Sequence, residues 1–191
     1  MKIAFDIDGC LANFTDAYAT KLVKVTGVNL LPKPLTIPTW DWDKHYGYSA
    51  DQIAATMENI AKDKLFWEKL DPIAPREVFS RIQVLSKEHE VYFLTNRFGT
   101  NPKQQTEHWL YDQGIHYPTV LITANKRPII EALKIDFFID DKLETMNELA
   151  WGDGLKKQFY LSNTTYNQAN RANGLKVATD VKDALQKADL W

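Results

Sequence analysis

The sequence is poor in three features, and each shortage excludes a class of protein. Its single cysteine, Cys10, cannot form an internal disulfide, which fits a reducing compartment and predicts a cytoplasmic location. No stretch approaches the roughly 18 consecutive apolar residues that suggest a membrane span, and Asp6 and Asp8 interrupt the first apolar run, so we expect no signal peptide. The net charge of -2 leaves no strong positive field for duplex nucleic acid or an anionic membrane.

The composition instead provides enough apolar material for a packed core. With 191 residues, of which 45% are hydrophobic, the chain predicts one domain, or one domain with a modest insertion. Short apolar stretches predict strands at 2–5, 91–95, 120–123, 136–140 and 158–162. Helical patterns follow at 11–26, 75–85, 102–113, 127–134, 143–151 and from 179 onward. This alternation predicts an α/β fold, a Rossmann-like parallel sheet with helices on both faces.

Residues 15–74 do not follow this alternation. Three prolines keep residues 28–48 irregular, and Ser49 with Gln52 forms a capping box that opens a helix through about residue 61. We therefore predict a small helical cap over residues 15–74, inserted after the first strand. The core domain then consists of residues 1–14 and 75–191.

The first strand ends in the acidic motif D-x-D-G, which contains Asp6, Asp8 and Gly9. Alternate side chains of a strand point to opposite sides, yet both carboxylates lie at the carboxyl end, where open α/β sheets bind ligands. Two neighbouring anions are costly to desolvate without a cation. Mg²⁺ fits, because it prefers oxygen ligands and often bridges carboxylates to a phosphate. A solvated Asp-Gly turn explains this motif alone equally well, so other residues must decide.

Polar residues follow two further strands at the same edge of the predicted sheet. They are Thr95, Asn96 and Arg97 after the strand at 91–95, and Asp140 and Asp141 after the strand at 136–140. Lys126 precedes the helix that leads into the strand at 136–140 and can reach the same crevice. Taken singly, these residues also suit a loop cap, a solvated lysine and a helix N-cap. Together they supply anions for a metal, a hydroxyl and a cation, the set that phosphoryl transfer requires.

These motifs, in this order, resemble those of the haloacid-dehalogenase superfamily of phosphatases. DIDGC is similar to the first motif, LTN to the hydroxyl motif, Lys126 to the lysine and FFIDD to the acidic fourth motif. The resemblance implies that Asp6 is the nucleophile that takes the phosphoryl group. It implies that Asp8 protonates the leaving oxygen and then activates water. Thr95, Asn96 and Lys126 would bind the phosphate oxygens.

The same resemblance implies a Mg²⁺ cofactor. Asp6, the backbone carbonyl of Asp8 and Asp140 would hold the ion, with Asp141 in support. The second aspartate of the first motif, Asp8, favours phosphate-ester chemistry over dehalogenation.

Within the superfamily, DIDGCLANF and LFWEKLDPIAP resemble the 5′(3′)-deoxyribonucleotidases. The chain departs from the D-G-V-L-A-D-F form of that family at Cys10 and Asn13, and has LTNR where the family has T-S-P. Phe14 matches an aromatic residue that flanks the nucleobase, and each aromatic face that stacks on a base contributes about 1–3 kcal/mol. We expect Trp40, Trp42 and Arg97 to join Phe14 in substrate binding, with Tyr46 and Trp67 as further candidates. The same aromatic residues also suit the core of a small cap.

The sequence therefore predicts a Mg²⁺-dependent phosphatase that hydrolyses a nucleoside monophosphate through an aspartyl-phosphate. One alternative keeps the chemistry and changes the substrate to a sugar phosphate or a nucleic-acid 3′ end, although the low net charge argues against a long nucleic acid. A non-catalytic phosphate-binding protein is the alternative from another class, and the intact acidic motifs argue against it. We expect a small-molecule phosphate monoester as the partner and no membrane. The base and sugar preference and the oligomeric state stay open.

Overall fold

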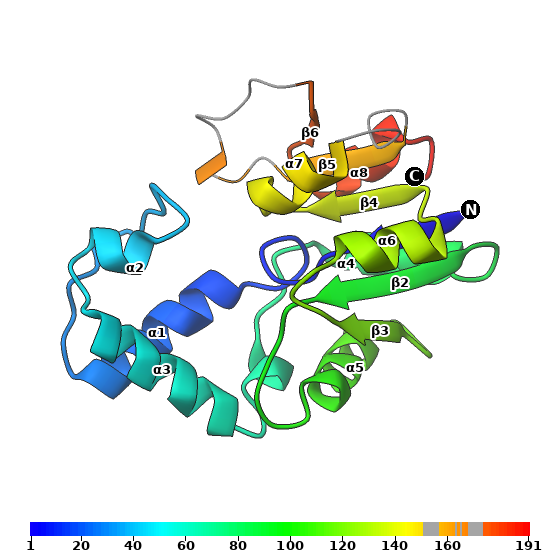
Figure 1. The fold of residues 1–191 in the computed structure, drawn as a ribbon. Helices are drawn as coiled ribbons and strands as arrows, with labels where there is room; N and C mark the ends of the chain where they lie inside the picture. The colour runs from blue at the N-terminus through cyan, green and yellow to red at the C-terminus, as the bar shows by residue number, and fades with distance from the viewer. Residues whose placement is uncertain (151–156, 163, 165, 168–173) are drawn as a thin grey trace.

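A computed structural model describes residues 1–191 except 151–156, 163, 165 and 168–173 (Figure 1). Among the described residues, six parallel strands form one sheet in the order β3-β2-β1-β4-β5-β6. The strands are β1 Lys2–Phe5, β2 Glu90–Thr95, β3 Thr119–Ile122, β4 Phe137–Asp140, β5 Gln158–Ser162 and β6 Lys176–Ala178. The predicted α/β class and all five predicted strands are confirmed.

The sixth strand, β6, was not predicted from the sequence. Its three residues are too few to show a period. β6 forms by pairing with β5, where Tyr160 lies opposite Lys176 and Ser162 opposite Ala178. A neighbour that is distant in sequence, and not a local pattern, therefore creates this strand.

The strands at the centre of the sheet are buried on both faces. On β1, Ile3 and Phe5 belong to one hydrophobic cluster and Ala4 to another, and all three are fully buried. On β4, Phe137 and Phe138 divide between the two clusters in the same way. Successive side chains of a strand point to opposite faces, so helices must cover both faces of this sheet.

Helices of the two faces come from different parts of the chain. Helices α4 Arg76–Leu85, α5 Pro102–Asp112 and α8 Val181–Lys187 contribute buried residues to the first cluster. Helices α6 Arg127–Leu133 and α7 Leu143–Ala150 contribute to the second. The predicted helix at 143–151 ends at Ala150 in the described residues, and residue 151 lies outside them. The layered arrangement of helix, sheet and helix matches the predicted fold.

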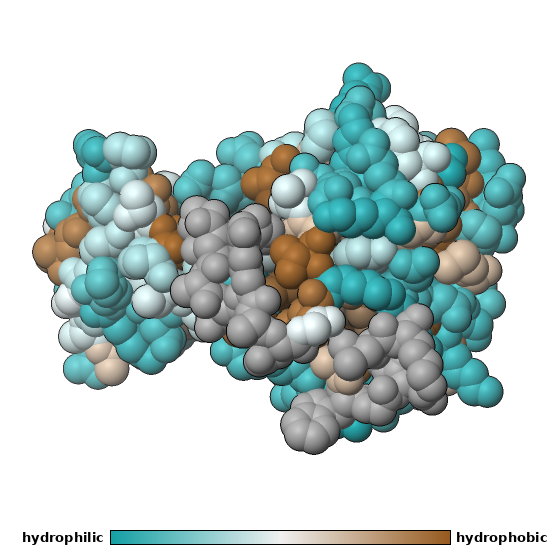
Figure 2. All heavy atoms as spheres, turned by 90° about the horizontal axis from the view of Figure 1, so that it is seen from above, coloured by the Kyte–Doolittle hydropathy of each residue, from teal (hydrophilic) through white to brown (hydrophobic). Residues whose placement is uncertain are grey.

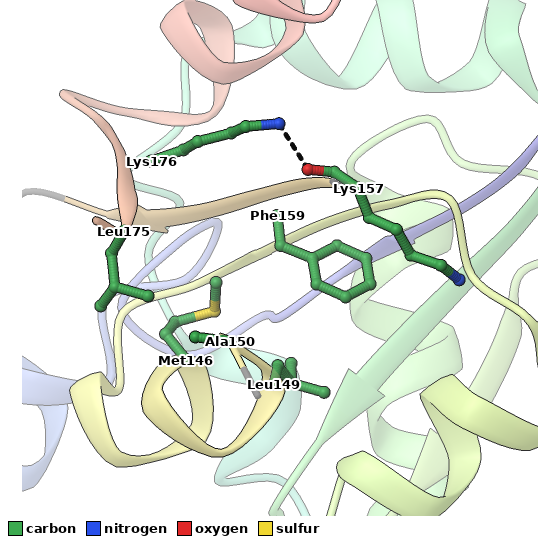
Figure 3. A pocket seen from close by; sticks show the side chains of 7 residues that line it. All are labelled: Met146, Leu149, Ala150, Lys157, Phe159, Leu175 and Lys176. Carbon is green, nitrogen blue, oxygen red and sulfur yellow. Dashed lines mark hydrogen bonds between the residues drawn. The ribbon is translucent and has the colours of Figure 1, made fainter. Parts of the chain in front are cut away.

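A small gap under α7 is too tightly packed to be a ligand site. Met146, Leu149, Phe159 and Leu175 surround it, and the Lys176 ammonium donates a hydrogen bond to the Lys157 carbonyl at 2.5 Å beside it (Figure 3). Its volume of about 10 Å³ has room for one water molecule at most. This region therefore belongs to the core.

Helices of the insertion follow β1. They are α1 Phe14–Thr26, the single turn α2 Trp42–His45, α3 Ala50–Lys62 and the 3₁₀ turn η1 Trp67–Lys69. Helices α1 and α3 pack side by side, and the arrowheads of β2 and β4 point toward this group of helices (Figure 1). The insertion therefore lies at the carboxyl edge of the sheet. Its division from the rest as a separate cap stays a prediction.

The start of α1 differs from the prediction. The helix begins at Phe14 and not at Leu11, because the amides of Leu11 and Ala12 donate to the Ile7 carbonyl in a tight turn. The Asn13 side chain then caps the helix by accepting a hydrogen bond from the Asp16 amide at 3.2 Å. This turn holds the acidic motif close to the first residue of the insertion.

Other helix ends were predicted with mixed success. The capping box of Ser49 and Gln52 is present at α3. The turn α2 interrupts the stretch predicted as irregular. Helix α8 begins at Val181 and not at Thr179, because the Asp180 side chain caps it.

Hydrophilic residues dominate the face of the molecule seen from above, with apolar patches near the middle of the view (Figure 2). None of the described helices combines the length and the apolar composition that a membrane crossing needs.

Candidate active site

A tight loop after β1 presents the acidic motif. The Asp6 amide donates to the Ile139 carbonyl at 3.0 Å, which extends the sheet ladder by one residue. Gly9 then adopts a φ of +86°, a conformation that favours glycine. The loop returns at once toward the sheet, so Asp6 and Asp8 both line the same cavity.

This cavity has a volume of about 380 Å³, which suits a small-molecule ligand. Its sheet side carries all of the predicted phosphate and metal residues, which are Asp6, Asp8, Thr95, Asn96, Lys126, Asp140 and Asp141. Its opposite side comes from the insertion and includes Phe14, Thr15, Tyr18, Trp40, Asp41, Asp43, Lys44, Ile53, Met57 and Trp67. The structure therefore brings together the residues predicted after three separate strands, and Lys126 lies with them.

Three buried carboxylates and one ammonium occupy the floor of the cavity. Asp6, Asp140 and Asp141 are at most 5% exposed. The Lys126 ammonium lies 2.6 Å from Asp6 Oδ1 and 2.6 Å from Asp140 Oδ2. The other oxygen of Asp140 accepts the Lys142 amide at 2.7 Å. Among the described ion pairs, these carboxylates have Lys126 as their one cation, which leaves the floor with excess negative charge.

The pKa values reflect this excess charge. Burial raises the pKa of Asp6 well above its usual range, and the Lys126 ammonium opposes that shift only in part. Burial, reinforced by the charge of Asp140, raises the pKa of Asp141 to about 7. Burial alone would lower the pKa of Lys126, but Asp6 and Asp140 outweigh it and raise that pKa. The carboxylates therefore sit where a further cation would stabilise their charged form.

The side chains also fit a metal ion by their spacing. Asp6, Cys10 and Asp141 each offer a ligand atom, and these atoms lie within 4.8 Å of one another. Asp140 differs, because Lys126 and the Lys142 amide occupy its two oxygens. Of the two fourth-motif carboxylates, Asp141 belongs to this group of possible ligand atoms, whereas Asp140 is joined to Asp6 through the Lys126 ammonium.

Two residues that position Asp141 were missed by the sequence analysis. The Tyr166 hydroxyl donates a hydrogen bond to Asp141 Oδ2, and the Asn167 side-chain amide donates to the Asp141 carbonyl at 2.6 Å. Burial and the Asp141 charge raise the pKa of Tyr166. Tyr166 and Asn167 follow β5 at the carboxyl edge, so their place after a strand was the one signal available.

Gly9 is also required by the space around it. A Cβ atom at Gly9 would lie 1.9 Å from Asp141 Oδ2, far inside a normal contact. Any other residue must displace the Asp141 carboxylate or move the loop.

Arg97 lies elsewhere than predicted. Its side chain is 1% exposed and is not among the described residues that line the cavity. Its guanidinium pairs with Asp8, with Nη2 2.9 Å from Oδ1 and Nε 3.1 Å from Oδ2. The Thr95 hydroxyl donates to the same Asp8 Oδ2 at 3.0 Å. Arg97 therefore contacts a predicted catalytic residue, and a direct contact with substrate is not supported.

The aromatic residues of the insertion divide into cavity and core. Phe14 is stacked on Tyr18 and on Trp67, with 5.6 Å between the ring centroids in each pair, and it lines the cavity. Trp40 lines the cavity and is 50% exposed. Trp42 is buried edge-on against Tyr18 and is not among the described cavity residues, so its predicted place in the substrate site is not supported.

Several solved structures share the fold of this chain. A protein from Thermotoga maritima assigned as a β-phosphoglucomutase matches with a TM-score of 0.60 and 16% identity, over 98% of each chain. A magnesium-bound protein from Bacillus subtilis, assigned as a haloacid-dehalogenase hydrolase, matches with a TM-score of 0.58 and 16% identity, over 98% of each chain. A haloacid-dehalogenase-like hydrolase from Xanthomonas campestris matches with a TM-score of 0.56 and 14% identity, over 100% of this chain and 91% of that one. The fold is that of the haloacid-dehalogenase-like hydrolases.

The sequence assigns the family within this class. The family model described as 5′ nucleotidase, deoxy (Pyrimidine), cytosolic type C protein matches residues 1–180. The chain belongs to this family, and it is a nucleotidase of the haloacid-dehalogenase type, a hydrolase of nucleoside monophosphates. No curated protein matches the chain.

Two matched variants separate the cost of a Cβ atom that overlaps Asp141 from the cost of a side chain at positive φ. Gly114 has a φ of +90°, almost that of Gly9, but a Cβ there would meet nothing within 4 Å. We expect Gly114→Ala to lower the free energy of unfolding by about 1–2 kcal/mol through strain alone. Gly9→Ala should cost about 1–3 kcal/mol more because of the overlap. Urea unfolding of both variants measures the difference, and equal losses would show that the loop absorbs the Cβ freely.

Proposed function

We propose that this protein is a Mg²⁺-dependent phosphatase that hydrolyses a nucleoside monophosphate through an aspartyl-phosphate on Asp6. The observation that carries the proposal is the cavity itself, which joins the acidic floor to an aromatic wall. Phosphoryl transfer needs charge neutralisation and positioning, and a nucleobase needs a flat apolar surface. The two sides of the cavity supply one requirement each.

The first half of the reaction forms the covalent intermediate. An Asp6 oxygen attacks phosphorus while the bond between phosphorus and the nucleoside oxygen breaks. The Asp8 carboxyl group gives its proton to that departing oxygen, which leaves as the nucleoside hydroxyl. Lys126, Thr95 and Asn96 lie where they can offset the charge of the phosphoryl oxygens.

The second half returns the enzyme to its starting state. The Asp8 carboxylate takes a proton from a water molecule, and the oxygen of that water attacks phosphorus. The bond between phosphorus and the Asp6 oxygen then breaks, which frees inorganic phosphate and the Asp6 carboxylate. Asp8 is left protonated for the next turnover.

Asp6, the backbone carbonyl of Asp8 and Asp141 are the residues that we propose hold Mg²⁺. Asp140 is assigned a different part, because both of its oxygens are already bonded and one of them holds Lys126. The bound ion supplies positive charge to the phosphate oxygens. The magnesium-bound Bacillus subtilis structure of the same fold supports this choice of metal.

The insertion is proposed to act as the cap of this site. Residues 15–74 supply the aromatic wall, and α1 joins that wall directly to the loop of the acidic motif. Phe14, at the first position of α1, is the residue that we assign to the nucleobase. Trp40 contacts Tyr166 edge-on at 5.5 Å, so the wall also meets the neighbour of Asp141. We further propose a cytoplasmic location and no long nucleic-acid partner, as the composition suggests.

Turnover by purified protein tests the function directly. With Mg²⁺ present, we expect phosphate release from deoxyribonucleoside and ribonucleoside monophosphates, at rates that rank the sugars and bases. Asp6→Asn should reduce turnover by more than about 10³-fold, because an amide cannot take the phosphoryl group. Asp51→Asn, at an exposed aspartate of α3, is the matched control. Full activity of Asp6→Asn, or no release from any nucleotide, would contradict the proposal.

The metal assignment has a readout that does not depend on activity. Mg²⁺ that binds only the folded state raises the melting temperature by mass action. Asp141→Asn should raise the Mg²⁺ concentration needed for half of this effect by more than about tenfold, which corresponds to about 1.4 kcal/mol. The exposed Asp112→Asn serves as the control. An unchanged titration of Asp141→Asn would remove this residue from the metal site.

The base-stacking assignment concerns Phe14. Loss of one stacking face costs about 1–3 kcal/mol, so Phe14→Ala should lower kcat/KM for a nucleotide by about tenfold or more. A small aryl phosphate, which has no base to stack, should be spared. Phe66→Ala is the control, because Phe66 contacts Phe14 edge-on but is not among the described cavity residues. Equal losses of Phe14→Ala on both substrates would make Phe14 a core residue of the cap.

A further inference from the structure

Arg97 is a buried cation, and each of its three guanidinium nitrogens donates to a partner within the protein. Its Nη1 lies 3.1 Å from the Thr106 hydroxyl and 3.5 Å from the Trp67 carbonyl. Nε and Nη2 face the two oxygens of Asp8. The Cζ atom of the guanidinium also lies over two indole rings, 5.1 Å from the ring centroid of Trp67 and 5.6 Å from that of Trp109. Hydrogen bonds and ring contacts together therefore restrict the orientation of the guanidinium.

Asp8 is the acidic residue to which this cation is matched. Among the described ion pairs, Asp8 is the only carboxylate that Arg97 contacts. A buried charge is costly unless it is paired, so the pair depends on both members. The planar guanidinium fork binds both carboxylate oxygens at once, which fixes the orientation of the carboxylate as well as its position. Thr95 adds a third bond to Asp8 from the same strand end.

We propose that Arg97 is a positioning residue that orients the Asp8 carboxyl group for proton transfer. This inference rests on the proposed function, in which Asp8 gives a proton to the leaving oxygen. Arg97 acts through Asp8 and does not touch the substrate, because it lies behind the described cavity wall. Through Trp67, which stacks on Phe14, the guanidinium also ties this carboxyl group to the aromatic wall.

The dependence of kcat/KM on the leaving group distinguishes a positioning role of Arg97 from a purely structural one. A nucleoside is a poor leaving group and needs the proton, whereas p-nitrophenolate leaves without one. The parameter kcat/KM reports the steps up to departure of the leaving group. A positioning role therefore predicts a loss on the nucleotide and little loss on p-nitrophenyl phosphate.

Three variants make this comparison. General acid–base help is worth typically 10²–10⁴-fold, so Arg97→Met should lower kcat/KM for the nucleotide by at least about tenfold and that for p-nitrophenyl phosphate by less than about threefold. Arg97→Lys keeps the positive charge but loses the bidentate guanidinium fork. Its kcat/KM for the nucleotide should therefore lie between the values of wild type and Arg97→Met. Arg81→Met is the matched control, since the half-buried Arg81 bonds the Leu190 carbonyl on the sheet side and faces no carboxylate among its described bonds.

A double variant tests whether Arg97 acts through Asp8. If it does, Arg97→Met in an Asp8→Asn background should lower kcat/KM for the nucleotide by less than about twofold further, because residues that act as a unit are not additive. The double variant removes both charges together, so it leaves no unpaired buried ion. Melting temperatures of all variants are measured alongside.

The outcomes separate the inference from the function on which it rests. If the wild-type protein hydrolyses neither the nucleotide nor p-nitrophenyl phosphate, the proposed function is contradicted. With an active wild type, multiplicative losses in the double variant or equal losses on both substrates would overturn the role of Arg97. An unfolded Arg97→Met together with wild-type kinetics in Arg97→Lys would likewise overturn it, since the arginine would then serve stability alone.

Discussion

Asp6, Asp140 and Asp141 place three carboxylates at one end of the sheet with almost no exposure to water, and the rest of the site compensates for that charge. Desolvation raises the pKa of Asp6 and Asp141, so the floor favours protons unless cations are near. Lys126 bridges two of the carboxylates and stays charged because of them. The remaining negative charge is the charge that the proposed Mg²⁺ would offset. Asp8 differs from these three, because its side chain pairs with Arg97 and not with Lys126 among the described ion pairs.

Parallel strands give the site its geometry. Because their carboxyl ends share one edge, short side chains from β1, β2 and β4 meet without long loops. Gly9 lets the first loop turn back close enough for Asp141 to lie against its backbone. The insertion is attached directly behind that loop, so the aromatic wall starts at Phe14, only a few residues from the acidic motif. One short turn therefore joins the charged floor to the helix on which the flat wall begins.

Features set by a local apolar pattern were predicted from the sequence, whereas features set by distant partners were not. Apolar runs and their polar ends predicted the strands and the edge at which the site lies, because buried parallel strands need apolar side chains throughout. Strand β6, which was not predicted, and the start of α1 at Phe14 depend on hydrogen-bond partners that the local sequence pattern does not show. Trp42 illustrates the same limit, because its type suits a substrate wall and a core equally, and packing against Tyr18 placed it in the core.

The sequence by itself determined the order of the elements, the acidic motif with Lys126, and the family to which the chain belongs. Only the tertiary structure decided that Asp141 and Cys10 offer ligand atoms beside Asp6, that Lys126 bridges Asp6 and Asp140, and that Arg97 pairs with Asp8. The reason is the same in each case. Adjacent residues at a strand end point in different directions, and which direction leads to the ligand depends on neighbours that are distant in sequence. The two oxygens of Asp140 bond Lys126 and the Lys142 amide, and Arg97 lies against two indole rings, outside the described lining of the cavity.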